Sequence, residues 1–242
     1  MTTIIILFAA LLPIGILAFY IWRKDRRAPE PVTELLKAFG LGVLSTLLSF
    51  CLSVPFGAMG LYPAEMATVS DAVMTAFFAA AVPEEVVKFF VLWLLLRRNR
   101  YFDERMDGIV YAVFVSLGFA ALENFMYLFG EEESVLSMGI SRALFAVPGH
   151  CCFGILMGYF YSMAKFCPKG RNTSRAFILI APILAHGLYD TLLFAMSAAP
   201  ALSIVLLGLF LVFCWRLWKQ GHKRIEEHLT ADRQEGRLEG ME

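Results

Sequence analysis

Two adjacent glutamates and two histidines are the side chains of this 242-residue chain that are best suited to hydrolytic chemistry. Glu84 and Glu85 adjoin, and Lys88 follows one helical turn later, where it can pair with either carboxylate. His150 and His186 lie in later apolar stretches. Amide hydrolysis needs a base that activates water, a donor for the oxyanion and a proton for the leaving amine. Either glutamate can be the base, and the histidines can position the water or donate to the oxyanion.

Further polar side chains occur inside the apolar stretches and can support these four. Asn124 follows Glu123 in the sequence and can donate to an oxyanion. Asp190 lies one turn after His186 on the same helical face, so it can hold the imidazole in place. Lys88 offsets the excess negative charge of the glutamates. Ionisable groups inside a bilayer cost several kcal/mol, which makes each of them a candidate for function.

A metal-dependent mechanism uses the same residue types. One Zn²⁺ bound by His150, His186 and Glu84 would leave the second glutamate as the base. The chain contains no HExxH segment, so this interpretation depends on residue types alone. We favour chemistry centred on the glutamates, with one Zn ion as the alternative cofactor.

The elements that must position these residues are membrane-spanning helices. Hydrophobic residues make up 59% of the chain and charged residues 17%, against about 45–50% and about 25% in soluble domains. The net charge of +0 argues against a nucleic-acid partner. The sequence therefore predicts an all-α polytopic bundle in the lipid bilayer. Seven apolar stretches are each long enough to cross it: about 3–22, 34–57, 72–96, 108–129, 141–164, 175–196 and 199–218.

The chain is predicted to form one transmembrane domain over residues 1–218, with the chemically capable residues in a core of about 72–196. Residues 219–242 form a polar tail whose alternating charges predict a solvated helix or a disordered segment. His222 and His228, within this tail, are expected to be solvated.

Loop charges set the predicted orientation. Basic residues follow the first, third, fifth and seventh stretches, whereas the other connections hold acidic residues and no Lys or Arg. The positive-inside rule therefore places the N-terminus outside the cell and the C-terminus in the cytosol. Arg142 falls outside the basic segments, near the outer end of its stretch, and is interpreted as a snorkelling anchor.

Helical rise places the polar residues at similar depths. Below the outer ends of their stretches, Glu85 lies about 20 Å deep, Glu123 about 9 Å, His150 about 14 Å and His186 about 15 Å. Stretches that alternate in direction thus place polar groups in one layer of the outer half of the membrane, which predicts a shared site. Any one of these residues could serve packing alone, but a double acid with two histidines exceeds what packing requires. Prolines precede three of the motifs and predict breaks in the helices: Pro83, Pro148 and Pro182.

The order of these motifs resembles that of the PrsW-type intramembrane proteases, a family related to CAAX-prenyl endopeptidases and bacteriocin-processing membrane proteins. The matching segments are EEVVK at 84–88, FDERMDGIVY at 102–111, FAALEN at 119–124, His150, and HGLYD at 186–190. Within the acidic motif, Arg105 stands where the family pattern has proline.

The resemblance implies hydrolysis of a peptide bond in or beside the plasma membrane of a bacterium. It also implies a single-pass membrane protein as the substrate, with site-one cleavage of an anti-sigma factor as the specific case. The acidic motif adds Glu104 as a supporting site residue, although hydropathy puts it at the cytosolic start of its stretch, far from the polar layer.

Two other functions use the same residues. Acids and histidines in membranes also build proton relays, so a proton- or cation-coupled transporter is one alternative. Transporters often contain inverted repeats, and the sequence shows none. A non-catalytic scaffold or sensor is the second alternative, and the full complement of acids and histidines disfavours it.

Overall fold

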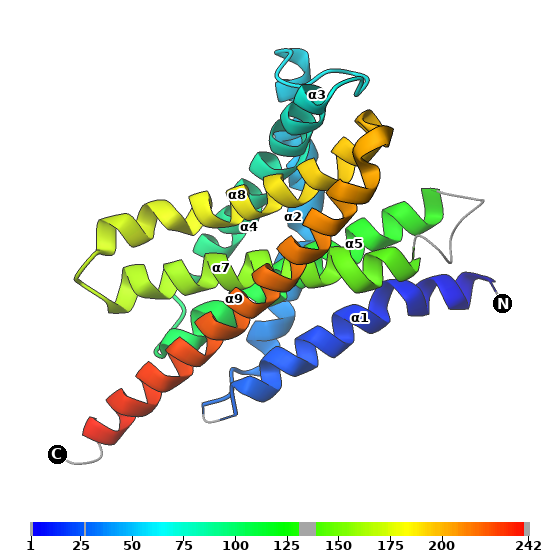
Figure 1. Cartoon of the computed structure of the whole chain (residues 1–242). Helices are drawn as coiled ribbons and strands as arrows, with labels where there is room; N and C mark the ends of the chain where they lie inside the picture. The colour runs from blue at the N-terminus through cyan, green and yellow to red at the C-terminus, as the bar shows by residue number, and fades with distance from the viewer. Residues whose placement is uncertain (1, 27, 131–138, 240–242) are drawn as a thin grey trace.

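The computed structural model describes residues 2–26, 28–130 and 139–239, and Figure 1 shows them as a bundle of crossing helices. Within these residues each of the seven predicted stretches is helical, and no strand occurs. The helices are α1 (Thr2–Lys24), α2 (Val32–Ala58), α3 (Val69–Met74), η1 (Thr75–Ala81), α4 (Val82–Leu96), α5 (Arg105–Gly130), η2 (Arg142–Ala146), α7 (Val147–Phe166), α8 (Arg171–Ala198), η3 (Pro200–Leu202) and α9 (Ser203–Glu239).

The architecture is the predicted polytopic helical membrane bundle. In the part of the chain that the structure describes, five helical segments are long and apolar enough to cross a membrane, by length and composition: 32–58, 105–128, 139–166, 171–198 and 200–236. The third predicted stretch is helical without interruption from α3 through η1 to α4. This stretch differs from those five segments in its charge, because it carries the two glutamates and the lysine of the EEVVK motif.

The pair α5 and α7 forms the centre of the bundle. The apolar window of α5 is 72% buried, whereas that of α9 is 11% buried and faces outward. Glycines bring the backbones together, because a Cβ on Gly158 of α7 would collide with Gly108 of α5. In the same way, a Cβ on Gly42 of α2 would collide with the Val115 carbonyl of α5. Small residues at helix crossings are what allows membrane helices to pack this closely.

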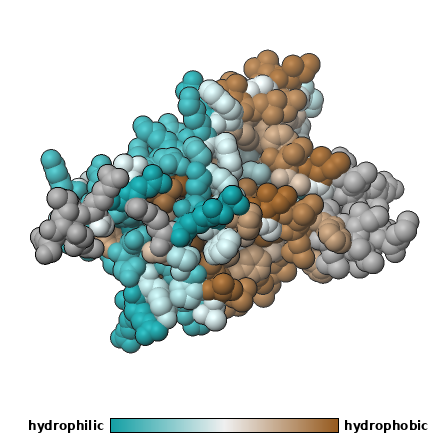
Figure 2. All heavy atoms as spheres, turned by 90° about the horizontal axis from the view of Figure 1, so that it is seen from below, coloured by the Kyte–Doolittle hydropathy of each residue, from teal (hydrophilic) through white to brown (hydrophobic). Residues whose placement is uncertain are grey.

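The basic connections lie together at one end of the molecule. Lys24 of α1 lies 2.7 Å from Glu226 of α9, and Lys165 of α7 donates to the Phe102 carbonyl just before α5. Figure 2 shows hydrophilic residues gathered at one end and hydrophobic residues over the other. This polar end is the one that the loop charges assign to the cytosol, and the orientation itself stays a prediction.

The described part of the tail continues α9 as a helix, and His222 is 50% exposed, as the prediction of a solvated helix requires. One face of this helix packs against the domain, so the prediction of a solvated tail is wrong for that face and for His228. Ile225 and His228 are buried, and the His228 ring stacks on Tyr159 with 4.5 Å between centroids. Asp232 accepts hydrogen bonds from two backbone N–H groups at the start of α5, at 2.9 and 3.0 Å. These residues recur at helical spacing among the charges and form a face that packs on the bundle.

Two of the three predicted proline breaks are π-helical turns. In η1 the N–H of Val82 bonds to the carbonyl of Phe77, directly before Pro83, and η2 has the same pattern directly before Pro148. The wider π turn makes room for a proline ring that would clash with a carbonyl in a regular α-helix. Pro182 lies inside the continuous α8, so the third predicted break is wrong. The helix runs on through each π turn, which carries the motif residues without a free helix end.

Candidate active site

Glu84, Glu85 and Lys88 on α4 form the centre of a buried polar cluster. Lys88 Nζ lies 2.9 Å from Glu85 Oε1 and 3.2 Å from Glu84 Oε2. The side chains of Glu85 and Lys88 are 0% exposed, whereas that of Glu84 is 14% exposed. Helical spacing places the ammonium against both carboxylates, as the sequence predicts. One carboxylate is therefore enclosed in the bundle, and the other reaches accessible space.

His186 on α8 joins the cluster through both ring nitrogens. Nδ1 lies 2.9 Å from Glu85 Oε1, and Nε2 lies 3.2 Å from Asp190 Oδ2. Nε2 is also 3.9 Å from Glu84 Oε2. Phe153 of α7 stacks on the imidazole, with 4.7 Å between ring centroids. The ring is thus held by carboxylates at its edge and by an aromatic face, which restricts its rotation.

His150 on α7 approaches the cluster from another side. Its Nδ1 lies 3.2 Å from Lys88 Nζ, and its Nε2 lies 2.7 Å from Glu123 Oε2 on α5. An ammonium has only hydrogen-bond donors, so Nδ1 accepts and the ring proton is on Nε2, which donates to Glu123. The ring centroids of His150 and His186 are 5.5 Å apart. The two histidines therefore face one common site.

Arg142 belongs to the cluster, and sequence reasoning missed this. Its Nε donates to Asn124 Oδ1 at 2.6 Å, and a terminal nitrogen lies 2.9 Å from Glu123 Oε2. The interpretation of Arg142 as a snorkelling lipid anchor is therefore wrong. Spacing offered a signal, because Arg142 precedes His150 by about two helical turns, which places both on one face. The charge of Arg142 compensates Glu123, which would otherwise be a carboxylate without a cationic partner beside it.

A cavity of about 430 Å³ opens onto the cluster between α2, η1 and α5. Glu84 and Glu123 both line it. Phe119 forms part of the same wall, and Lys88 Nζ lies 3.9 Å from the centre of its ring. The aromatic face shields the ammonium from the cavity side and interacts favourably with its charge.

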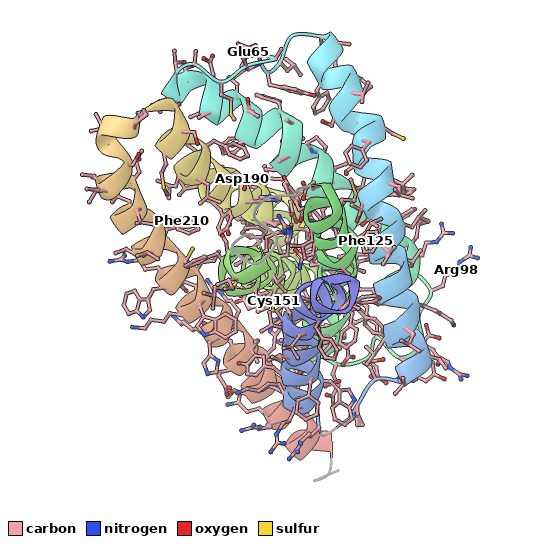
Figure 3. All side chains as sticks on the ribbon, turned by 90° about the vertical axis from the view of Figure 1, so that its right-hand side faces the viewer. Glu65, Arg98, Phe125, Cys151, Asp190 and Phe210 are labelled. Carbon is pink, nitrogen blue, oxygen red and sulfur yellow. The ribbon has the colours of Figure 1, made fainter. Side chains whose placement is uncertain are left out.

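Eight of the nine predicted site residues come together, from α4, α5, α7 and α8. Figure 3 labels Asp190 beside the interior region where side-chain nitrogen and oxygen atoms gather. The polar layer inferred from helical rise therefore corresponds to a real cluster, while the chemical role of each member stays a prediction. The eight are Glu84, Glu85, Lys88, Glu123, Asn124, His150, His186 and Asp190.

Glu104 lies in a different group, at the polar end. Its carboxylate groups with those of Asp25 and Asp107, with one oxygen of each within 4.8 Å of the others. Burial raises the pKa of Asp25 to about 7 and has the same effect on nearby Glu30, whose pKa is also about 7. The structure does not bring Glu104 to the cluster around Glu85, as its place at the start of α5 leads one to expect.

The cluster offers metal-ligand atoms, but Lys88 already fills the position among them. Glu84, Glu85 and His150 each present one ligand atom, and these atoms lie within 4.8 Å of one another. This set has Glu85 in place of the His186 of the predicted set. Lys88 Nζ lies 2.9–3.2 Å from the same three residues. The residues as arranged fit an internal ammonium, and a metal ion would fit only if Lys88 moved away.

Comparisons with known proteins cover most of the chain. A family model described as PrsW family intramembrane metalloprotease matches residues 30–216. Protease PrsW of Clostridioides difficile (strain 630) is 34% identical over 212 residues, 86% of each chain. Protease PrsW of Geobacillus kaustophilus (strain HTA426) is 35% identical over 81% of each chain. Protease PrsW of Bacillus subtilis (strain 168) is 34% identical over 87% of this chain and 90% of its own. No solved structure matches the chain.

Proposed function

The chain belongs to the PrsW family of intramembrane metalloproteases, and from this membership we propose that the buried cluster hydrolyses a peptide bond of a membrane-anchored protein. One observation supports the assignment to this cluster: Glu84 lines the cavity, while its neighbour Glu85 is enclosed behind it. A carboxylate that reaches accessible space beside fixed hydrogen-bond donors is what the activation of water requires.

Glu84 is the proposed general base. It takes a proton from a water molecule in the cavity, and the hydroxide oxygen adds to the carbonyl carbon of the scissile bond. Protonated Glu84 then gives this proton to the amide nitrogen as the C–N bond breaks. The products are a carboxylic acid and an amine, and Glu84 returns to its starting state.

His186 is the proposed donor to the oxyanion that forms during this addition. Its Nε2 lies 3.9 Å from Glu84 Oε2, close to where the attacking water would sit. Glu85 and Phe153 hold the ring, and its Nε2–H, which lies 3.2 Å from Asp190 Oδ2, is shared with the oxyanion when charge develops. Glu85 is in this scheme a positioning residue that orients His186 and Lys88.

His150 is proposed to position the cluster instead of contacting the substrate. Its Nδ1 accepts from Lys88 and so has no proton to donate, and its Nε2 is held by Glu123 at 2.7 Å, closer than the 3.2 Å between His186 Nε2 and Asp190. Arg142, which itself donates to Asn124, holds Glu123 from the other side. This chain of contacts fixes the ammonium of Lys88, which keeps two adjacent carboxylates from repelling one another in a low-dielectric site.

The family description includes a metal ion, and Glu84, Glu85 and His150 would hold it if Lys88 moved. A metal ion bound there would polarise a carbonyl or activate a water molecule. None of the steps above uses one, because Lys88 Nζ fills that position in the structure.

The proposed substrate is a single-pass membrane protein, and the proposed biological role is site-one cleavage of an anti-sigma factor in a bacterial plasma membrane. The position of the cluster among membrane-spanning helices supports a membrane-anchored substrate, because the scissile bond must reach that depth. The bacterial sources of the relatives support the location.

The test is cleavage of a co-reconstituted single-pass reporter by purified protein in liposomes. Glu84→Gln removes the base at constant volume, so cleavage should fall by about 10²-fold or more. Glu85→Gln should also impair cleavage, through His186. Glu65→Gln, in the exposed connection before α3, is the matched control and should cleave like wild type. Full activity in Glu84→Gln would contradict the mechanism, and reversible loss of cleavage on chelation would favour the metal ion.

A further inference from the structure

The cavity beside Glu84 is a cleft formed by the divergence of two helices. Gly42 of α2 and Gly118 of α5 each lie so close to the other helix that a Cβ would collide with its backbone. The lining begins just further from the polar end, at Thr46 on α2, one turn after Gly42, and at Phe119 on α5, the residue after Gly118, and it continues to Ser53. The two glycines therefore hold α2 and α5 in contact at one end of the cleft, and the helices diverge from that point.

The mouth of the cleft faces lipid. Phe50 on α2 and Met126 on α5 line it, and they are 47% and 40% exposed. Tyr127 beside them is also exposed. Large exposed apolar side chains at this depth contact the hydrocarbon of a bilayer, so an occupant can enter the cleft sideways from the membrane.

In addition to Glu84 and Glu123, the walls of the cleft carry hydroxyl groups. The Thr75 hydroxyl, on η1, is buried and has no hydrogen-bond partner among the described residues. Opposite it, Ser49 on α2 donates to the Thr46 carbonyl at 2.7 Å, which leaves its oxygen free to accept. A lipid chain offers no partner to a buried hydroxyl, and an unpartnered hydroxyl is costly. A peptide backbone offers both N–H and C=O groups.

The size of the cleft favours an unwound segment over a helix. A helix about 11 Å across that rises 1.5 Å per residue occupies roughly 140 Å³ per residue, so a volume of about 430 Å³ holds about three residues. A helix also pairs its own backbone groups, and unwinding it inside a membrane requires replacement partners. The hydroxyls of the walls are suited to that task.

We propose that the cleft between α2, η1 and α5 binds about three unwound residues of a substrate's transmembrane segment, with the Thr75 hydroxyl bonded to their backbone beside Glu84. This inference rests on the proposed proteolytic function, since it identifies where that substrate lies. It assigns a substrate-binding role to residues outside the cluster, and it predicts a preference for segments whose helix is weak.

The first experiment maps the occupant by photocrosslinking in the Glu84→Gln variant, where chemistry is blocked. Benzoylphenylalanine replaces Phe50 in the cleft or, as a control, Leu211 on α9, which is 45% exposed and lies outside the cleft. The probe is a single-pass reporter with a Gly-Gly pair at the centre of its transmembrane helix, where glycine weakens the helix. We expect crosslinks from position 50 and none above background from position 211.

The second experiment removes the hydroxyl alone. Thr75→Val keeps the side-chain shape and should lower kcat/KM for the Gly-Gly reporter by about 5–10-fold, chiefly through KM. Thr191→Val is the matched control, because the Thr191 hydroxyl on α8 is also buried with no hydrogen-bond partner in the described parts of the chain but does not line the cleft. It should stay within about twofold of wild type. Thr75→Ser restores the hydroxyl and should recover most of the loss.

These experiments distinguish the proposed binding role of the cleft from the proposed proteolytic function. The binding role of the cleft would be contradicted by crosslinks from position 211 and not from position 50, or by equal effects of Thr75→Val and Thr191→Val. Cleavage by the wild-type protein would in that case still support the proteolytic function. Crosslinks from position 50 without cleavage by wild type would support the cleft and remove the proposed function. If neither crosslinks nor cleavage occurred, both proposals would be contradicted.

Discussion

The described residues contain two groups of buried carboxylates, one in the middle of the bundle and one at its polar end. In the middle, each buried acid has a cation of the chain beside it. Glu85 lies 2.9 Å from Lys88, and Glu123 lies 2.9 Å from Arg142. Lys88 lies on the same helix as Glu85, and Arg142 lies on a different helix from Glu123, so both charges come from the chain itself and do not depend on ions from solution.

The group at the polar end is built differently. Asp25, Glu30 and Asp107 are all buried, and among the described residues none of them forms an ion pair. Their partners are backbone N–H groups and the Tyr111 hydroxyl, which donates to Glu30. Burial therefore raises the pKa of both Asp25 and Glu30 to about 7.

The difference follows from access to water. A carboxylate near the membrane surface can take a proton from solvent when ionisation is unfavourable. A carboxylate deep among apolar helices needs a fixed charge state if it is to act as a base, and an internal cation provides one. We therefore expect the middle group to govern catalysis and the polar-end group to make stability depend on pH.

Removing the cation from the middle group is expected to have the largest effect. Lys88→Met leaves Glu84 and Glu85 without their shared partner, which should lower the free energy of unfolding by about 3–5 kcal/mol and abolish cleavage. Denaturation in detergent measures this change in the free energy of unfolding. Lys37→Met is the control, because Lys37 is 62% exposed in its pair with Glu34, and such pairs contribute at most about 1 kcal/mol.

Lys88→Met also tests whether the lysine occupies the position that a metal ion would take. If Lys88 fills that place, Lys88→Met should bind a divalent metal ion such as Zn²⁺ more tightly than wild type, as metal analysis after dialysis would show. Equal stability and equal metal content in the two proteins would contradict the view that Lys88 is the cation of this group.

A smaller effect is expected from Arg142→Met. Loss of the hydrogen bond to Asn124 and of the ion pair with Glu123 should cost about 1–3 kcal/mol and slow cleavage by about tenfold, since Glu123 and His150 lose their fixed position. Arg142→Lys should not restore activity, because an ammonium cannot span both partners as a planar guanidinium does. Arg98→Met, at an exposed site labelled in Figure 3, should behave like wild type.

The smallest effect concerns pH and the polar-end group. Because the pKa of Asp25 rises from 3.8 to about 7 and that of Glu30 from 4.5 to about 7, the folded protein binds more protons than the unfolded chain between about pH 4 and pH 7. Stability should therefore be greatest at the acidic end and fall as pH rises through 7. Asp25→Asn should flatten this dependence and raise the melting temperature at pH 8 by about 2–4 °C. A wild-type melting temperature that rises from pH 5 to pH 8 would contradict the prediction, and Glu65→Gln should leave the slope unchanged.

Contacts within one helix could be predicted from the sequence. The spacing of Glu84, Glu85 and Lys88 placed one cation against two acids, and the spacing of His186 and Asp190 formed a pair. The helical period is fixed, so a spacing of three or four residues determines a contact wherever the helix lies. Helical rise even placed residues of four helices in one layer, because depth depends only on length along the axis.

Contacts between helices needed the tertiary structure. Rise gives the depth of Arg142 but not the direction in which it points, and so the sequence could not distinguish a lipid anchor from the partner of Glu123. The packing of the C-terminal tail and the cleft beside Glu84 depend in the same way on how helices rotate and cross. Glycine contacts such as that of Gly42 set those crossings, and a glycine in the sequence does not say which backbone it will meet. The sequence predicted eight members of the cluster and their common layer, because helical spacing and rise are constant. The tertiary structure added Arg142, left Glu104 outside, and decided which residues share a charge and which line the cavity.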